Sequence, residues 1–255
     1  MAETAFMKRF IVSTLVIISS VISISCKKTP SMSYEEQKTL LSSTRINTEI
    51  KALEEKLGSA SDIKEKGKLL AEISSLQLEK GDVHAAMKSS EKALKHSKDG
   101  FMALYVHGKS CRMSGDYARS IKQLSRSIKK NESFAPAHFE LGNVYYRKGE
   151  YHAARKKYEK AHALDENNID TMNNLAVICA RSGDVKRARI LLEKVISIEE
   201  NNATAHRNLG LLYEKHIKDT KRAVDHYSRY LEILPAAPDR KLVELWINSI
   251  RGNNK

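Results

Sequence analysis

A glycine followed by an acidic residue recurs along this sequence at a fixed interval. The copies stand 34 residues apart, as Gly81-Asp82, Gly115-Asp116, Gly149-Glu150 and Gly183-Asp184. Self-similarity at a period of about 20–50 residues indicates a repeat architecture, in which each unit packs mainly on its neighbours. In this register the chain divides into units 67–100, 101–134, 135–168, 169–202 and a slightly longer 203–237. The period therefore predicts one stacked array.

Within each unit, the residue types at fixed positions predict two helices joined by a tight turn. The eighth position is always small, so that a second helix can approach closely: Ser74, Gly108, Gly142, Ala176 and Gly210. The turn glycine can take positive φ, which ends the first helix. Five places later another small residue follows: Ala86, Ser120, Ala154, Ala188 and, one residue shifted, Ala223. The composition, with only 4 Pro and 11 Gly, agrees with helices.

These positions resemble the tetratricopeptide repeat (TPR), whose pattern is W-x2-L-G-x2-Y…A-x3-F…P. The resemblance covers residues 67–237 and is strongest in the third and fourth units. The early Trp is absent, the closing Pro survives as Pro235, and residues 216–219 replace the last turn glycine. The resemblance implies an all-α, right-handed α-solenoid of about five TPR helix pairs.

Both ends of such an array expose an apolar face that needs covering. Residues 34–66 are predicted to hold an N-terminal capping helix and the start of the array. Its apolar stripe is Ile46, Ile50, Leu53 and Leu57. This helix either caps the array or contacts a partner helix. Residues 238–255 are predicted to form a C-terminal capping helix and tail, with Leu242, Leu245, Trp246 and Ile250 at helical spacing.

The N-terminus has the form of an export signal. Lys8 and Arg9 precede the apolar run 10–24, which is shorter than the roughly 20 residues that span a bilayer comfortably. The run ends in Ser23-Ile24-Ser25-Cys26, which resembles a relaxed lipobox and implies that Cys26 carries a lipid. We therefore expect a lipoprotein signal peptide at 1–25 and a tether at 26–33. Ordinary cleavage and an uncleaved anchor are the alternatives, and Met1 and Met7 are both candidate starts.

The charge balance suggests the kind of partner. The formal net charge is +13, which suits nucleic acid, anionic lipid headgroups or acidic protein segments. The basic residues are spread over the repeats rather than clustered, and export would remove nucleic acid from reach. We expect protein partners, and membrane association through the lipid anchor on the periplasmic side of a bacterial envelope.

Catalytic and metal-binding patterns are absent from the sequence. The nine His form no HExxH pair, and there is no P-loop or Gly-x-Ser-x-Gly. Cys111 and Cys179 occupy the same register position two repeats apart. That separation is too large for a disulfide, so both are predicted to be buried apolar fillers. We expect no enzyme activity, no cofactor and no metal.

The TPR resemblance implies that the first helices line a concave groove for a protein partner. Its groove-facing positions, and the sixth position beside them, give the candidate site: Tyr105, Arg112, Phe139, Asn143, Tyr146, Arg147, Asn174, Arg181, Arg207, Asn208 and Lys215. Asn143, Asn174 and Asn208 resemble the Asn residues with which some TPR grooves hold a peptide backbone. Arg147, Arg181 and Lys215 share one register position and would form a basic stripe.

Together these features predict a non-catalytic scaffold that binds an extended or acidic protein segment, in an envelope assembly process. Phe139 occupies the place of the Lys found in the chaperone-type carboxylate clamp, so the resemblance does not extend to that clamp. Two alternatives remain open. One is a structural lipoprotein that assembles with copies of itself, and the other is a TPR oligomer that binds a solute or small ligand.

Overall fold

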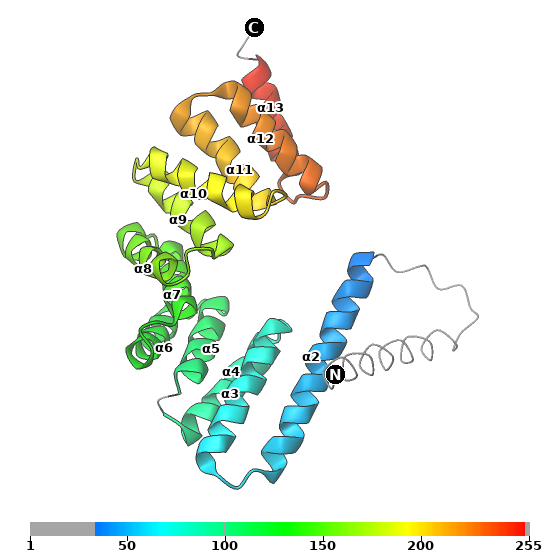
Figure 1. Ribbon diagram of the computed structural model, residues 1–255, viewed down its shortest axis with the longest axis vertical. Coiled ribbons are helices and arrows are strands. Elements are labelled where there is room, and N and C mark those ends of the chain that lie inside the picture. Colours follow the sequence, from blue (N-terminus) through cyan, green and yellow to red (C-terminus); the bar gives the residue numbers. More distant parts are fainter. Residues whose placement is uncertain (1–33, 99, 253–255) are drawn as a thin grey trace, which may run out of the picture. The chain divides into compact units, whose positions relative to one another are not determined.

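The computed structural model describes residues 34–98 and 100–252 (Figure 1). Residues 46–255 form one compact unit, and residues 34–45 are the described part of another. The predicted signal peptide, Cys26 and the tether lie outside the described residues. Among the residues described, no helix is both long and apolar enough to cross a membrane.

The described chain is all-α, and five helix pairs make up the array. The bounds are α2 (Tyr34–Ser59), α3 (Ile63–Glu79), α4 (Val83–His96), α5 (Phe101–Met113), α6 (Tyr117–Lys130), α7 (Ala135–Arg147), α8 (Tyr151–Leu164), α9 (Ile169–Arg181), α10 (Val185–Ile198), α11 (Ala203–Leu212), η1 (Tyr213–Ile217), α12 (Thr220–Ile233) and α13 (Arg240–Gly252). From α3 onward each helix packs on the next, as expected of a TPR solenoid.

The recurring dipeptide ends one helix and begins the next. The four turn glycines have φ between 77 and 87°, the left-handed conformation that ends the first helix. The following Asp side chain then caps the second helix. Asp116, for example, accepts the backbone N–H of Arg119 at 2.9 Å. Glu150 makes no such side-chain cap. The dipeptide thus specifies the turn.

The fifth repeat reaches the same turn without glycine. Its extra residue is absorbed in a π-helical turn, η1, and Lys218 follows with φ of 63°. Asp219 then caps α12 through the backbone N–H of Arg222. The insertion therefore widens one helical turn and leaves the next helix correctly started.

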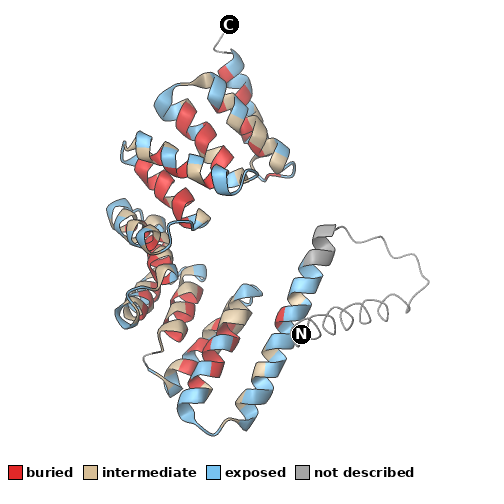
Figure 2. Ribbon diagram, viewed as in Figure 1, coloured by how far each residue is buried: buried red, intermediate tan, exposed pale blue. Residues whose placement is uncertain are grey.

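Every helix from α3 to α13 contributes buried residues to the core (Figure 2). The eighth-position glycines lie close to side chains of the second helices. A Cβ on Gly142 would lie 2.6 Å from the ring of Tyr158, and one on Gly210 would lie 2.5 Å from the ring of Tyr227. One apolar cluster runs from Ala154 to Ile250. Cys111 and Cys179 are buried free thiols, as the sequence predicted.

At the N-terminal end, α2 runs from Tyr34 to Ser59, within the segment 34–66 that was predicted to hold a capping helix. Leu57 packs against a small cluster made of Leu70, Ala71, Ala93 and Ala103. The next helix, α3, begins at Ile63, four residues before the first repeat unit, because Asp62 caps it through the backbone N–H of Glu65.

At the C-terminal end, α13 packs on α12 and buries Val243, Ile247 and Ile250. The predicted stripe is only partly correct. Leu242 and Leu245 are 45% and 64% exposed, because the buried face of α13 is centred on Val243 and Ile247 instead.

Candidate functional site

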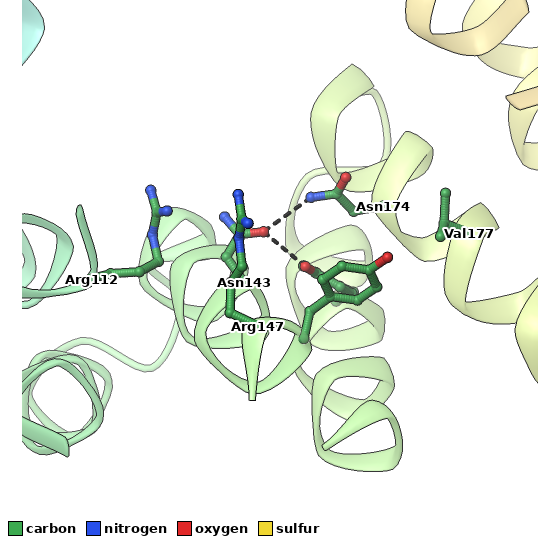
Figure 3. A pocket seen from close by; sticks show the side chains of 7 residues that line it. Arg112, Asn143, Arg147, Asn174 and Val177 are labelled. Carbon is green, nitrogen blue, oxygen red and sulfur yellow. Dashed lines mark hydrogen bonds between the residues drawn. The ribbon is translucent and has the colours of Figure 1, made fainter. Parts of the chain in front are cut away.

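The first helices of the middle repeats surround a hollow of about 440 Å³, here called the central hollow (Figure 3). Its lining is Arg112 from α5, Asn143, Tyr146 and Arg147 from α7, Tyr158 from α8, and Asn174 and Val177 from α9. Five of these residues belong to the predicted site. Tyr158 and Val177 were not predicted as lining residues.

The two asparagines of the central hollow are bonded to each other. Asn143 Oδ1 accepts hydrogen bonds from Tyr158 Oη at 2.8 Å and from Asn174 Nδ2 at 3.0 Å (Figure 3). The Asn143 carbonyl oxygen is therefore already used within the protein. The amide oxygen of Asn174, a residue that lines the hollow, lies on the side away from Asn143 (Figure 3). Only one of these amides is thus placed to hold a peptide backbone.

Sequence reasoning missed a buried carboxylate that pairs with Arg112, one of the residues lining this hollow. The side chain of Glu140 is only 4% exposed and pairs with Arg112 Nε at 2.7 Å and Lys109 Nζ at 3.5 Å. A buried carboxylate is costly unless it is paired, so Glu140 fixes both cations and offsets their charge. Burial, and then the charge of Glu140, raise the pKa of Tyr105 and keep its phenol neutral. The only sequence signal was an acidic residue among the apolar positions of α7.

Arg147 differs from the other cations of the site. Its side chain is exposed, and no ion pair or hydrogen bond to it is found among residues 34–98 and 100–252. The guanidinium of Arg181 instead stacks on Tyr151, 4.1 Å from the ring centre. Lys215 pairs with Glu214 and lines none of the hollows described here. Lys215 lies in the π-helical turn η1, and this turn changes the register of the helix.

A neighbouring hollow of about 280 Å³, the C-terminal hollow, continues the first-helix face. It is lined in part by Tyr146, Arg181, Arg207 and Asn208. Arg207 Nε is held by Asp239 Oδ2 at 2.6 Å, and hydrogen bonds from Tyr230 and Arg207 lower the pKa of that carboxyl group although burial opposes them. Arg207 is therefore largely neutralised, like Arg112.

The last two predicted residues, Tyr105 and Phe139, line a third hollow of about 200 Å³. Asp165 and Asp170 lie at the same hollow. The first-helix face is therefore acidic beside the starts of α7 and α9 and basic beside their ends. Within the described residues no group of three or more potential metal ligands occurs.

The two helices of each pair, of 13 and 14 residues from α5 to α10, are joined by a turn that contains one residue in the left-handed conformation, and small residues lie at the helix contacts. These features define the class of helical-repeat solenoids. Residues 132–201 match a tetratricopeptide-repeat family model, and residues 108–149 match a TPR-repeat model. The chain is a tetratricopeptide-repeat protein, and this fold is consistent with a protein–protein interaction scaffold.

Solved structures show the same fold at low sequence identity. YrrB, "a TPR protein with an unusual peptide-binding site", is 16% identical with a TM-score of 0.58, over 71% of this chain and 91% of that one. MamA is 26% identical with a TM-score of 0.55, over 63% and 94% of the two chains. PilW, a "widely conserved type IV pilus biogenesis factor", is 16% identical with a TM-score of 0.66, over 73% and 86%. No curated protein matches the sequence.

Proposed function

We propose that this protein is a non-catalytic scaffold whose concave groove binds an extended partner segment that carries a carboxylate. The observation that supports this most strongly is the exposed Arg147, which has no charged or hydrogen-bonded partner among the described residues and lines the central hollow with Tyr146 and Asn174. A guanidinium can bind a carboxylate through two parallel hydrogen bonds. The Asn174 oxygen can accept a backbone N–H of the same segment.

Because other cations of the groove are already paired, the proposed recognition of a carboxylate depends on a few positions and not on the whole basic surface. Arg112 is paired with Glu140 and Arg207 with Asp239. An acidic segment would therefore gain most of its binding energy from Arg147. Arg181 would add a second contact at the C-terminal hollow, either by moving off the ring of Tyr151 or by binding the segment while still stacked on that ring. Val177 lines both hollows and would contact an apolar side chain between the two acidic ones.

This binding mode can be tested with defined peptides. The probe is a fluorescein-labelled octapeptide of alternating Ser and Asp, and the protein is residues 34–255, measured by fluorescence anisotropy at low salt. We expect Arg147→Glu/Arg181→Glu to weaken binding at least tenfold, since tenfold corresponds to about 1.4 kcal/mol. A peptide with Lys in place of Asp should not bind measurably.

The control carries the same change of charge on the second helices. Lys156 on α8 and Lys186 on α10 are exposed, so Lys156→Glu/Lys186→Glu alters the net charge equally without touching the hollows. Equal loss of binding in both variants would mean that overall charge attracts the peptide, and the groove assignment would be rejected.

We further propose that the scaffold is anchored by a lipid on Cys26 and faces the periplasm, in an envelope assembly process. The support is the signal-like segment 1–25 and, by analogy only, the likeness to PilW. Metabolic labelling with a palmitate analogue should label the protein, and Cys26→Ser should abolish the label and release the protein from membranes. Unchanged labelling of Cys26→Ser would refute the anchor independently of the groove.

A further inference from the structure

A fourth hollow lies at the N-terminal end of the array and differs from the groove in chemistry. It measures about 530 Å³ and is lined by Ala52 and Leu53 of α2, Ser75 and Leu76 of α3, and Met102 of α5. Glu49, Lys56 and Glu72 line it as well. This end hollow is therefore an apolar depression whose lining includes two carboxylates and one ammonium group.

The opposite end of the array exposes an apolar ridge. Leu242 and Leu245 lie on one side of α13 and are 45% and 64% exposed. Lys241 and Arg251 of the same helix are also exposed. Leu242 and Leu245 together form a small exposed apolar patch on one face of α13. Arg240 and Glu244 pair with each other at 2.8 Å, so Lys241 and Arg251 give this C-terminal ridge a net positive charge.

The two ends are both apolar and complement each other in charge. The end hollow is apolar and is lined by two carboxylates against one ammonium group, whereas the whole chain carries 44 Lys and Arg against 31 Asp and Glu. The C-terminal ridge is apolar and carries a net positive charge. We propose that the end hollow of one molecule receives Leu242 and Leu245 of a second copy, so that molecules associate head to tail.

The geometry of this contact fixes the kind of assembly. Two different patches meet, so the contact is heterologous, and repeating it gives an open chain of molecules rather than a closed dimer. One helix in one hollow buries less than the roughly 1,200–2,000 Å² of a standard stable interface. Association is therefore weak and depends on concentration. The contact lies away from Arg147 and Arg181 and goes beyond the proposed peptide binding.

Sedimentation velocity on residues 34–255 tests the proposal, because this segment contains every described helix and the apolar clusters of the array. The weight-average mass should rise with concentration beyond that of a dimer. Leu245→Glu should give monomers by placing a carboxylate against the two carboxylates of the hollow. Ala52→Arg should do the same by filling the hollow, and both sites are exposed enough to keep the fold.

A mixture of the Leu245→Glu and Ala52→Arg variants distinguishes head-to-tail assembly from other kinds of association. Each retains one working end, so a mixture should form a one-to-one dimer and nothing larger. Ile190→Glu, at an apolar residue 51% exposed on α10, is the matched control and should assemble like the parent. A parent that is monomeric at all concentrations, a mixture that stays monomeric, or a dimer insensitive to Leu245→Glu would each overturn the proposal.

The groove variant Arg147→Glu/Arg181→Glu should assemble like the parent. Loss of peptide binding with intact assembly, or the reverse, would therefore show which of the two surfaces has been misassigned.

Discussion

Replacement of Gly142 by Ala tests how the helices of one repeat meet. Gly142 on α7 faces Tyr158 on α8, sixteen residues further along, and an added Cβ would lie 2.6 Å from two carbons of that ring. Tyr158 is 1% exposed, so the ring has little room to move. In the next repeat, the same two positions hold Ala176 and Leu192. Alanine opposite leucine is therefore one pairing that the array accommodates, although glycine faces leucine in the second repeat, at Gly108 and Leu124.

Three opposing contributions set the size of the effect. Ala in place of a mid-helix Gly gains about 1 kcal/mol of helix propensity. Overpacking against a buried side chain costs about 1–3 kcal/mol. Displacement of Tyr158 also weakens its 2.8 Å hydrogen bond to Asn143, at about 1 kcal/mol. We expect Gly142→Ala to lower the free energy of unfolding by about 1–3 kcal/mol.

The neighbouring repeat indicates how to relieve the clash. Tyr158→Leu in the Gly142→Ala background recreates the Ala176–Leu192 pair, so the double variant should be more stable than the sum of the single effects. The expected coupling is about 1–2 kcal/mol, within the range found for residues in contact. Gly58→Ala is the control, because nothing lies within 4 Å of its added Cβ, and it should be neutral or stabilising.

Urea unfolding followed by circular dichroism at 222 nm measures these effects. Repeat arrays can unfold in more than one step, so midpoints and slopes should be compared together across the series. Additive single effects, or a Gly142→Ala variant more stable than the parent, would refute the close-contact explanation of the eighth position.

Three further predictions follow from local features of the fold. Lys218→Gly should raise the midpoint of urea unfolding by an amount equivalent to less than about 1 kcal/mol, since Lys218 has φ of 63° where the other repeats use glycine; an unchanged or lower midpoint would contradict this. Burial lowers the pKa values of four histidines below 6.5, so the folded state binds fewer protons than the unfolded state; they are His107, His138, His162 and His226. Thermal melts should therefore show full stability above about pH 6.5 and a loss of stability as the pH falls below that value. A melting temperature that does not change with pH would refute the assignment. Glu140→Gln should cost about 1 kcal/mol in urea unfolding yet tighten binding of the acidic octapeptide, because Arg112 and Lys109 lose their counter-charge; weaker peptide binding would show that Glu140 acts chiefly by positioning Arg112.

The fold was predictable because its determinants are local and repeat in the chain. The glycine–aspartate turns, the small helix contacts and the all-α class could be inferred from the sequence, and the structure confirms them. The exposed ridge of α13 was missed for a different reason. Leu242 and Leu245 have the helical spacing of a buried stripe, and only the packing of α13 on α12 decides which of two adjacent apolar stripes is covered.

The candidate site was predictable as a list of positions but not as a set of interactions. Register alone places Arg112, Arg147 and Arg181 on the first-helix face, yet it does not show that Glu140 holds Arg112 or that Tyr151 holds Arg181. These partners come from neighbouring helices, up to 30 residues away in sequence. Lys215 departs from the stripe because a π-helical turn changes the register locally.

Site-specific photo-crosslinking in cells tests the proposed groove most directly. Val177 lines both the central and the C-terminal hollow, so a benzophenone amino acid at position 177 would contact a bound segment. The same group at Lys186, exposed on the second helix of that repeat, serves as the control. We predict a discrete crosslinked partner from position 177 that is absent from position 186 and is lost with Arg147→Glu. A partner crosslinked from position 186 and not from 177 would contradict the groove as the binding surface.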